Sequence, residues 1–342
     1  MKTPKSVFFL ALLLICSLSI MAQQKVILQS AGTTRVFGGS NPFNDAYTAA
    51  ASGDTIYLPG GNLPYPQTID KGLVIYGAGF NPDSTTATGP TNLGGDMLLS
   101  ENADNLKLEG IHISGNLYIN NNHKINNLSI KRCRLASLNY PGDGITSPCE
   151  NNLITECIVN GNISLYNLKN SIISNCIIQG NVSGGRELVF SNNLFLLNTD
   201  NWNWNFNDTD NSLISNNIFR RDQLPDVIHS ACESNTFSNN VFKGNPPVGF
   251  NTFTGNFTGV DVASLFVLQS GAAFDFKHDY HLVNPAAYLG TDGTQVGIYG
   301  GSFPFKSNTM PSNPHIVSKA IPPHPDSSGN LQVQLKVSAQ NN

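Results

Sequence analysis

The chain has 342 residues and a formal net charge of −4, and only 12% of its residues are charged. This weakly acidic composition excludes electrostatic attraction to nucleic acid or to an anionic membrane as the main mode of binding. The length is typical of two compact domains or of one elongated β architecture.

The first 22 residues have the three-part layout of a secretory signal peptide. Lys2 and Lys5 precede a run of apolar residues, and a short segment of smaller residues ends at Ala22. Cys16 follows isoleucine, where a lipoprotein signal has a small residue, so cleavage after Ala22 is preferred to lipid anchoring. No later stretch contains the roughly 20 apolar residues that a membrane helix needs. We therefore expect a secreted protein, extracellular or periplasmic, without a membrane span.

The segment AAASGDTIYLPGG (49–61) predicts how the fold begins. We expect a short helix over about 43–51 that ends at Gly53, since glycine can take a positive φ angle. TIYLP is then the first strand, and Pro59 starts the turn into the first coil. Asp54 lies in the turn before that strand, so we interpret it as a structural residue.

A repeat of about 20 residues runs through the Asn-rich centre of the chain. Of the 44 asparagines, 31 lie between residues 101 and 250. Each copy combines β-branched or aromatic residues, which favour strands, with asparagine or glycine, which favour turns. Such copies must stack to bury their apolar faces, so they predict a solenoid. Six copies align without gaps: LSIKRCRL (128–135), NLITECIV (152–159), SIISNCII (171–178), LVFSNNLF (188–195), SLISNNIF (212–219) and NTFSNNVF (235–242).

One position of the repeat is always cysteine or asparagine. Stacked asparagines can hydrogen-bond from coil to coil, and the cysteines would extend the column as buried thiols. Five cysteines follow the leader, an odd number, and none forms a CxxC pair, so we expect no zinc site. The column comprises Cys133, Cys157, Cys176, Asn193, Asn217 and Asn240, and the other two cysteines are Cys149 and Cys232.

Over roughly residues 35–303 the chain resembles the pectate-lyase-like superfamily of right-handed parallel β-helix proteins. The segment 41–79 is similar to the first coils of such proteins, and YHLVNPAAYLGTDGTQVGIYGG (280–301) is similar to their closing coil. The resemblance implies an all-β, right-handed parallel β-helix over 23–305 with a short N-terminal capping helix. Residues 306–342 form a Pro-rich linker with a strand at 331–339, which either crosses the last coil or pairs with a partner.

Two catalytic chemistries on a polysaccharide are compatible with this fold. A polysaccharide hydrolase needs two carboxylates. Asp143 lies in an Asp-Gly-Ile segment, but no Asp-Asp pair follows, so we interpret it as a turn residue. A polysaccharide lyase needs a basic residue to take a proton, and a cation, such as calcium, or a basic group beside the uronic carboxylate. Its candidate residues are Arg134, Arg186 and Arg220.

Arginines 132 and 134 raise separate questions. Arg132 is expected beside Glu156 as a surface ion pair. The positions equivalent to Arg134 in later coils are Ile158, Ile177, Leu194, Ile218 and Val241. If this column faces outward, it indicates a covered face or a ligand groove; if it faces inward, Arg134 only marks the start of the inner stack.

The segment TDNWNWNFNDTDN (199–211) is the strongest candidate for sugar binding. In an extended chain Trp202, Trp204 and Phe206 would share one face, and aromatic faces beside amides suit sugar rings. The alternative is that the rings fill a bulge between coils. His278, Asp279 and His281 are interpreted as a surface turn, as is Asp292, so no metal site is predicted.

The sequence thus leaves two hypotheses. The first is a non-catalytic secreted protein that presents an extended surface to a polysaccharide or cell-surface glycan, without a cofactor. The second is a polysaccharide lyase or related enzyme acting on an acidic glycan, for which calcium would be the cofactor.

Overall fold

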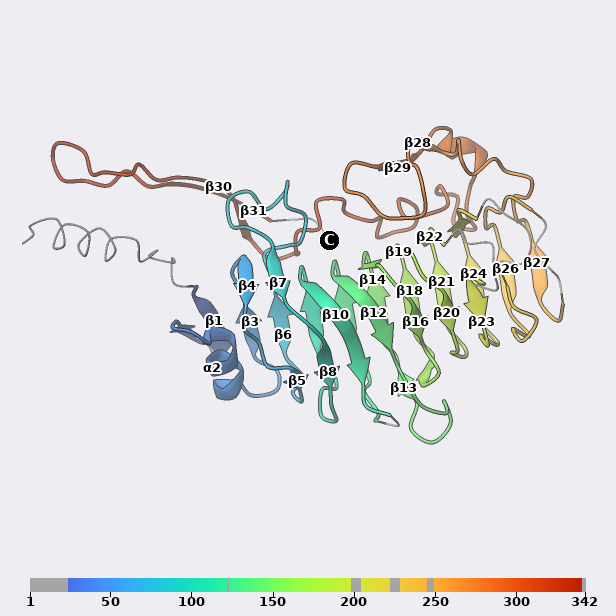
Figure 1. The fold of residues 1–342 in the computed structure, drawn as a ribbon, viewed down its shortest axis with the longest axis horizontal. Helices are drawn as coiled ribbons and strands as arrows, with labels where there is room; N and C mark the ends of the chain where they lie inside the picture. Colours follow the sequence, from blue (N-terminus) through green and yellow to red (C-terminus); the bar gives the residue numbers. More distant parts are fainter. Residues whose placement is uncertain (1–23, 122, 198–203, 222–227, 245–248, 340–342) are drawn as a thin grey trace, which may run out of the picture.

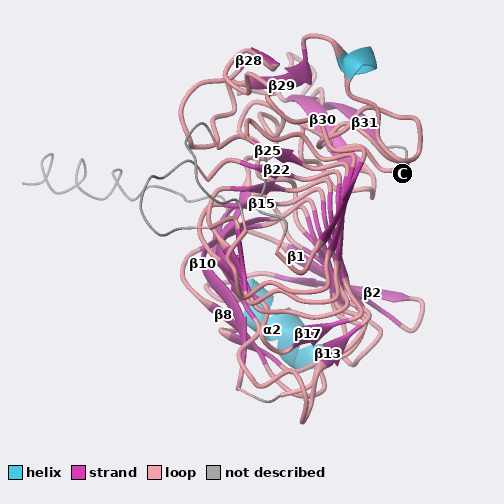
Figure 2. Ribbon diagram, turned by 90° about the vertical axis from the view of Figure 1, so that its right-hand side faces the viewer, coloured by secondary structure: helices cyan, strands magenta, loops and turns pink. Residues whose placement is uncertain are grey.

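The computed structural model describes residues 24–121, 123–197, 204–221, 228–244 and 249–339. They form a parallel β-solenoid whose coils stack along the long axis of the molecule (Figure 1). Seen from the end, the strands and turns of successive coils superpose around a closed core (Figure 2). The predicted all-β parallel solenoid is confirmed.

The first long sheet, sheet A, has 12 strands among the described residues. All neighbours from β3 onward are parallel, whereas β1 pairs antiparallel with both β2 and β3 and so closes the first coil. In spatial order the strands are β2 (Thr33–Phe37), β1 (Val26–Ser30), β3 (Thr55–Tyr57), β6 (Val74–Tyr76), β9 (Lys107–Glu109), β11 (Ser129–Lys131), β14 (Leu153–Thr155), β18 (Ile172–Ser174), β21 (Val189–Ser191), β24 (Leu213–Ser215), β26 (Thr236–Ser238) and β27 (Thr252–Thr254).

The second long sheet, sheet B, has 13 described strands and bends, so most coils contribute two short strands to it. They are β4 (Gly61–Leu63), β5 (Thr68–Ile69), β7 (Thr91–Leu93), β8 (Met97–Leu99), β10 (His112–Ile119), β12 (Arg134–Asn139), β15 (Ile158–Val159), β16 (Ile163–Ser164), β19 (Ile177–Ile178), β20 (Val182–Ser183), β22 (Leu194–Phe195), β23 (Phe206–Asn207) and β25 (Ile218–Phe219). A small sheet pairs β13 (Cys149–Glu150) with β17 (Leu168–Lys169).

The helix α2 (Pro42–Ala49) covers the first coil and ends two residues earlier than predicted. Proline at its first position suits a helix start, and Phe43 is fully buried against the core. Gly53 takes a φ angle of 94°, and the Asp54 carboxylate accepts a hydrogen bond from Ala51 N at 2.8 Å. This contact gives Asp54 the structural role expected of it.

Left-handed residues flank most sheet A strands, and this explains the abundance of asparagine. Asparagine tolerates a positive φ better than other residues with a side chain. The column that precedes the strands includes Asn105, Asn127, Asn151, Asn170, Glu187, Asn211 and Ser234. The column that follows them, here called the turn column, comprises Gly110, Arg132, Glu156, Asn175, Asn192, Asn216 and Asn239.

Next to the turn column, a ladder of buried amides and thiols runs through the core, as the sequence predicts. Asn217 Oδ1 accepts hydrogen bonds from Asn193 N (2.8 Å) and Asn193 Nδ2 (3.0 Å). Asn217 Nδ2 in turn donates to Asn240 Oδ1 at 3.0 Å. The thiols of Cys133, Cys157 and Cys176 continue this column and are free and buried.

The segment 289–312, here called the C-terminal strap, runs back along the outside of the solenoid over the turn column. Asn239 donates to Leu289 O at 3.0 Å, and Asn175 donates to Gly300 O at 2.9 Å. Six coils nearer the N-terminus than Asn239, Ser312 N donates to Glu109 Oε1 at 2.8 Å. The predicted closing coil at 280–301 is therefore wrong in its second half, because these residues cover the side of the solenoid.

The last elements lie outside the coils. β28 (Phe266–Leu268) pairs antiparallel with β29 (Asp279–Leu282), and a short 3-10 helix, η1 (Pro285–Ala287), precedes the strap. After the strap, β30 (His315–Ala320) and β31 (Gln334–Ser338) form an antiparallel hairpin that extends past the first coils, red in Figure 1. The predicted strand at 331–339 thus pairs within the chain, near the first coils rather than the last. Among the described residues no helix is long and apolar enough to cross a bilayer.

Candidate functional site

The column of Arg134 faces away from the core, and most of it is covered. Ile158, Ile177 and Leu194 have no exposed surface, although their neighbours Val159 and Ile178 already fill the core behind them. They belong to a second apolar cluster outside the core, and the segment 262–305 supplies most of its other members. These are Val262, Leu265, Phe266, Tyr280, Leu282, Val296, Ile298 and Phe305. The covered face, one of the two outcomes that the sequence left open, is the one observed.

Arg134 lies at the end of this covered face, beneath two aromatic rings. Its guanidinium carbon is 5.8 Å from the ring centre of Phe274 and 5.6 Å from that of Phe276, distances typical of cation–π contacts. Partial burial lowers the pKa of Arg134 from its ordinary value. The column neighbour on the preceding coil is His112, whose burial lowers its pKa. Arg134 is therefore half-buried, with two aromatic rings over its guanidinium group.

The other two lyase candidates lie elsewhere. Arg220 is buried four strands along sheet B from Arg134, about 19 Å away, and donates to Gln269 Oε1 at 2.8 Å. Arg186 is exposed beside the small sheet of β13 and β17, on another side of the solenoid, with its Nε 4.0 Å from Asp210 Oδ2. The three arginines that sequence reasoning singled out do not meet in one groove.

The aromatic segment is only partly as expected. Trp202 lies outside the described residues. Trp204 is half-buried, and its ring centre lies 4.1 Å from that of His229 in an edge-to-face contact. Phe206 is fully buried in β23, where it contacts Phe190 and Phe195. Phe206 is therefore not available to a sugar, because β23 turns that side chain into the core.

Arg132 forms a buried ion cluster rather than a surface pair. Its side chain is 1% exposed, and its Nε lies 2.8 Å from Glu156 Oε2. Its Nη1 lies 3.4 Å from Glu109 Oε1 and also donates to Met310 O at 3.1 Å. The cluster therefore ties three coils to the C-terminal strap, which the sequence did not predict.

The polar turns carry no described metal site. Asp143 accepts hydrogen bonds from Ile145 N and Thr146 N, both at 2.8 Å, and these bonds with the one from the Thr146 hydroxyl lower its pKa to about 2. His281 Nδ1 lies 2.6 Å from Asp279 Oδ1, and its ring stacks on Tyr299 beside a cavity of about 420 Å³. Within the described parts of the chain, no three His, Cys, Asp or Glu residues come together as metal ligands.

The outer face of sheet A carries two parallel columns of side chains. Parallel register repeats each side chain at about 4.8 Å along the axis. The first column contains Leu153, Ile172, Val189 and Leu213, of which all but Val189 are about 40% exposed. The second consists of hydroxyls: Thr155, Ser174, Ser191, Ser215, Ser238 and Thr254. An exposed aliphatic stripe thus runs beside a row of hydroxyls, of which Thr155 and Ser215 are buried, Ser174, Ser191 and Ser238 are half-buried and Thr254 is exposed.

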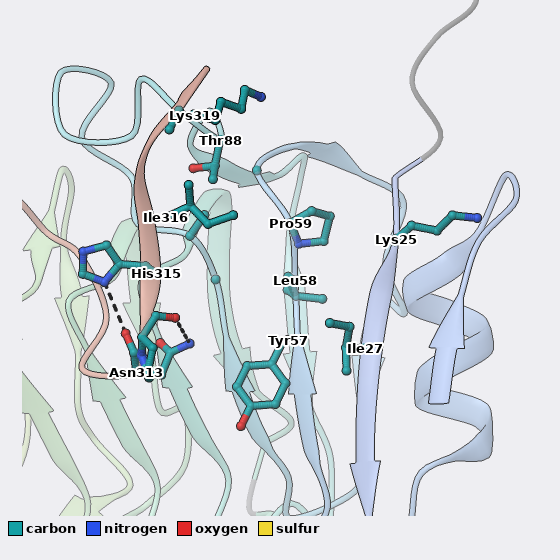
Figure 3. Close-up of a pocket in the computed structure, with 15 residues that line it drawn as sticks. Lys25, Ile27, Tyr57, Leu58, Pro59, Thr88, Asn313, His315, Ile316 and Lys319 are labelled. Atoms are coloured by element: carbon teal, nitrogen blue, oxygen red, sulfur yellow. Dashed lines mark hydrogen bonds between the residues drawn. The ribbon is translucent and has the colours of Figure 1, made fainter. Parts of the chain in front are cut away.

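A groove opens over the first coils, where the C-terminal strap ends and the hairpin begins (Figure 3). It encloses about 620 Å³ and lies between β30 on one side and β1 and the turn after β3 on the other. Ile316 and Ile27 face the space from opposite walls, with Pro59 between them. Sequence reasoning missed this groove, since its walls come from the two ends of the chain and neither end belongs to the repeat.

One signal for the face of sheet A was present in the sequence. In the aligned repeats, the middle residue of each sheet A strand, such as Ile154, faces the core. The next residue is Thr or Ser in every copy from 155 to 238, and the preceding residue is Leu, Ile or Val in four successive copies. Such alternation is the expected mark of a half-exposed strand.

Comparison with known proteins adds no relative to this geometry: no family model, no curated protein and no solved structure matches the chain. The parallel β-solenoid itself is consistent with the pectate-lyase-like fold that the sequence resembles. A fold of this kind hosts many functions, so function must be argued from the surfaces described above.

Proposed function

We propose that the protein is exported and binds a polysaccharide or cell-surface glycan, without catalysis, along the outer face of sheet A. The observation that carries the proposal is the exposed aliphatic column beside the column of hydroxyls. A sugar ring has an apolar face of C–H groups and a rim of hydroxyls, so an extended glycan chain can contact both columns at once. The low charge of the chain favours a ligand recognised by shape and hydrogen bonds over one recognised by charge.

The placement of the three candidate arginines supports the non-catalytic form of the proposal. A lyase needs a base and a charge-neutralising group within reach of one sugar unit. Arg134 is covered by aromatic rings, Arg220 is buried about 19 Å away, and Arg186 lies on another side of the solenoid.

Retention on insoluble polysaccharides tests the binding surface. The triple variant Leu153→Lys, Ile172→Lys, Leu213→Lys places three hydrated charges on the stripe and removes its apolar contacts. Covering the exposed part of each side chain is worth about 1 kcal/mol, or about 3 kcal/mol for all three, so we expect affinity to fall about 100-fold or more. The matched control is Val36→Lys, Ile145→Lys, Val283→Lys, which adds the same charge at exposed apolar positions elsewhere.

Equal retention of the two triple variants would contradict glycan binding on sheet A. The non-catalytic part is tested separately, by incubation with uronate polymers and calcium and measurement of absorbance by the unsaturated product. Turnover that is lost in Arg134→Ala, Arg186→Ala or Arg220→Ala would replace this proposal with the lyase hypothesis.

A further inference from the structure

The groove of Figure 3 has the size and the lining of a small-molecule site. Its volume of about 620 Å³ lies within the range of roughly 300–1,000 Å³ that is usual for ligand pockets. The walls are largely aliphatic, with Ile27, Leu58, Pro59 and Ile316 contributed by three separate segments, and the rings of Tyr57 and His315 are the aromatic ones among the described lining residues.

Glycines keep the floor of the groove close to the next coil. A Cβ atom at Gly60 would lie 2.1 Å from Gly89 O, and one at Gly77 would lie 2.2 Å from Gly110 O. Both positions therefore require glycine, because the backbone of the next coil lies where a Cβ atom would be. In later coils the C-terminal strap lies over the turn column. The groove lies where the strap has ended, over the same side of the first coils.

The two charged residues that line the groove, Lys25 and Lys319, are both basic. Lys25 and Lys319 lie on its opposite rims, and His315 lies on the wall formed by β30 (Figure 3). No aspartate or glutamate is among the described lining residues. The side-chain amide of Asn313 also lines the groove, and its Oδ1 is buried without a hydrogen-bond partner. The amide nitrogen Nδ2 of Asn313 donates to Pro314 O at 3.5 Å.

The hairpin wall is held in place at its base. Thr309 Oγ1 accepts hydrogen bonds from Phe80 N (3.2 Å) and Asn81 N (2.8 Å). Ser312 donates through its backbone and its hydroxyl to the two carboxylate oxygens of Glu109, at 2.8 and 2.9 Å. These contacts fix the chain one residue before Asn313, so the groove is largely preformed at that end.

We propose that this groove binds an amphipathic anion, a molecule with an alkyl chain and a carboxylate or phosphate head group. The alkyl chain would lie between Ile27 and Ile316, and the head group would lie at the basic rim, near Lys319 or Lys25. This site is distinct from the glycan surface of sheet A and does not depend on it.

Isothermal titration calorimetry of the purified protein tests the proposal with dodecanoate and dodecyl phosphate as probes. Dodecyl trimethylammonium is the charge-reversed control, and octyl glucoside is the neutral one, all below their micelle concentrations. We expect saturable binding of at least one anion, weakened by added salt. A preference for dodecanoate or for dodecyl phosphate distinguishes the two head groups. Equal binding of the anions and the cation would overturn the proposal.

Two variants locate the site. Lys319→Glu should weaken binding of the anion about tenfold, because a rim attraction becomes a repulsion. The matched control is Lys336→Glu, which makes the same charge change on the partner strand of the hairpin, outside the groove. Ala78→Trp fills the groove from its floor and should abolish binding of either anion.

Melting temperature and far-UV circular dichroism establish that each variant is folded. If Ala78→Trp fails to fold, Ile316→Ser removes apolar contact from the exposed wall and should weaken binding of dodecanoate at least fivefold. Unchanged binding in the folded Lys319→Glu and Ile316→Ser variants would overturn the assignment to this groove.

Discussion

Removal of the Arg132 charge should destabilise the protein far more than a surface mutation would. We choose Arg132→Asn because Arg132 has a φ angle of 49°, and asparagine accepts this conformation as it does at Asn175 and Asn192 of the same turn column. The substitution therefore removes the guanidinium without adding backbone strain.

The expected magnitude follows from the burial of the two carboxylates. Glu156 is 1% exposed and Glu109 is 10% exposed at the side chain, so both would lose a partner that water cannot replace. Breaking a buried ion pair by removing one partner costs about 3–5 kcal/mol. Met310 O would also lose its donor. We expect the free energy of unfolding to fall by about 4 kcal/mol.

Urea denaturation followed by circular dichroism measures this change, with Lys131→Asn as the matched control. Lys131 Nζ lies 3.5 Å from Glu156 Oε1, but its side chain is 20% exposed, so its loss should cost less than about 1 kcal/mol. Hydrogen exchange at Ser312 N should accelerate in Arg132→Asn, because the strap loses its anchor. Equal midpoints for the two variants, with unchanged exchange at Ser312, would refute the reasoning.

A rescue experiment separates charge from packing. Glu109→Gln with Glu156→Gln in the Arg132→Asn background removes both buried carboxylates, and the one charge that loses its partner is Lys131, whose side chain is 20% exposed. Most of the lost stability should return, since the cost arises from isolated buried charges and not from the missing contacts. No recovery would assign the loss to packing.

Three further predictions concern the interior. Asn217→Ala removes four hydrogen bonds of the amide ladder and should lower the free energy of unfolding, measured by urea denaturation, by about 3 kcal/mol. The control Asn181→Ala should lower it by less than about 1 kcal/mol, and similar losses for the two variants would contradict the role of the ladder. The buried thiols should resist alkylation by iodoacetamide at pH 8 until the protein is unfolded, and rapid labelling of the native protein would contradict their burial. Burial raises the pKa of Cys149 to about 11 from 9.0. Between pH 9 and 11 the unfolded state therefore loses a proton that the folded state keeps, so the free energy of unfolding should fall by about 2–3 kcal/mol as pH rises through this window. A Cys149→Ser variant should show a smaller fall.

The coils could be predicted from sequence because each repeat carries its own strand and turn signals. The residue at each turn, the ladder of Cys133, Cys157 and Asn193, and the helix before Gly53 all follow from local chemistry: left-handed backbone selects asparagine or glycine, and stacking places like over like. These features recur once per coil, so one copy supports the interpretation of the next.

The C-terminal strap could not be predicted because its contacts are neither local nor repeated. Met310 meets Arg132 across 178 residues of chain, and Ser312 meets Glu109 across 203. The groove depends on the same long-range contacts, because β30 forms its wall only where the strap has returned to the first coils. Phe206 was misplaced for a related reason: the long insertion before it hides which residues enter β23, and therefore which side chains face inward.

The turn column connects these features physically. Its residues take left-handed backbone, so their side chains point outward at the corner between the sheets, where Asn175 and Asn239 donate to carbonyls of the strap. The strap and the residues before it bury the outward column of Ile158 and Ile177 on sheet B. Among the described residues, none gives sheet A such a cover over Leu153, Ile172 and Leu213, which stay about 40% exposed. Both sheets have an outward apolar column, but the described part of the chain covers only one of them. The exposed column is therefore the one available to a ligand, which is why the proposed glycan surface is assigned to sheet A.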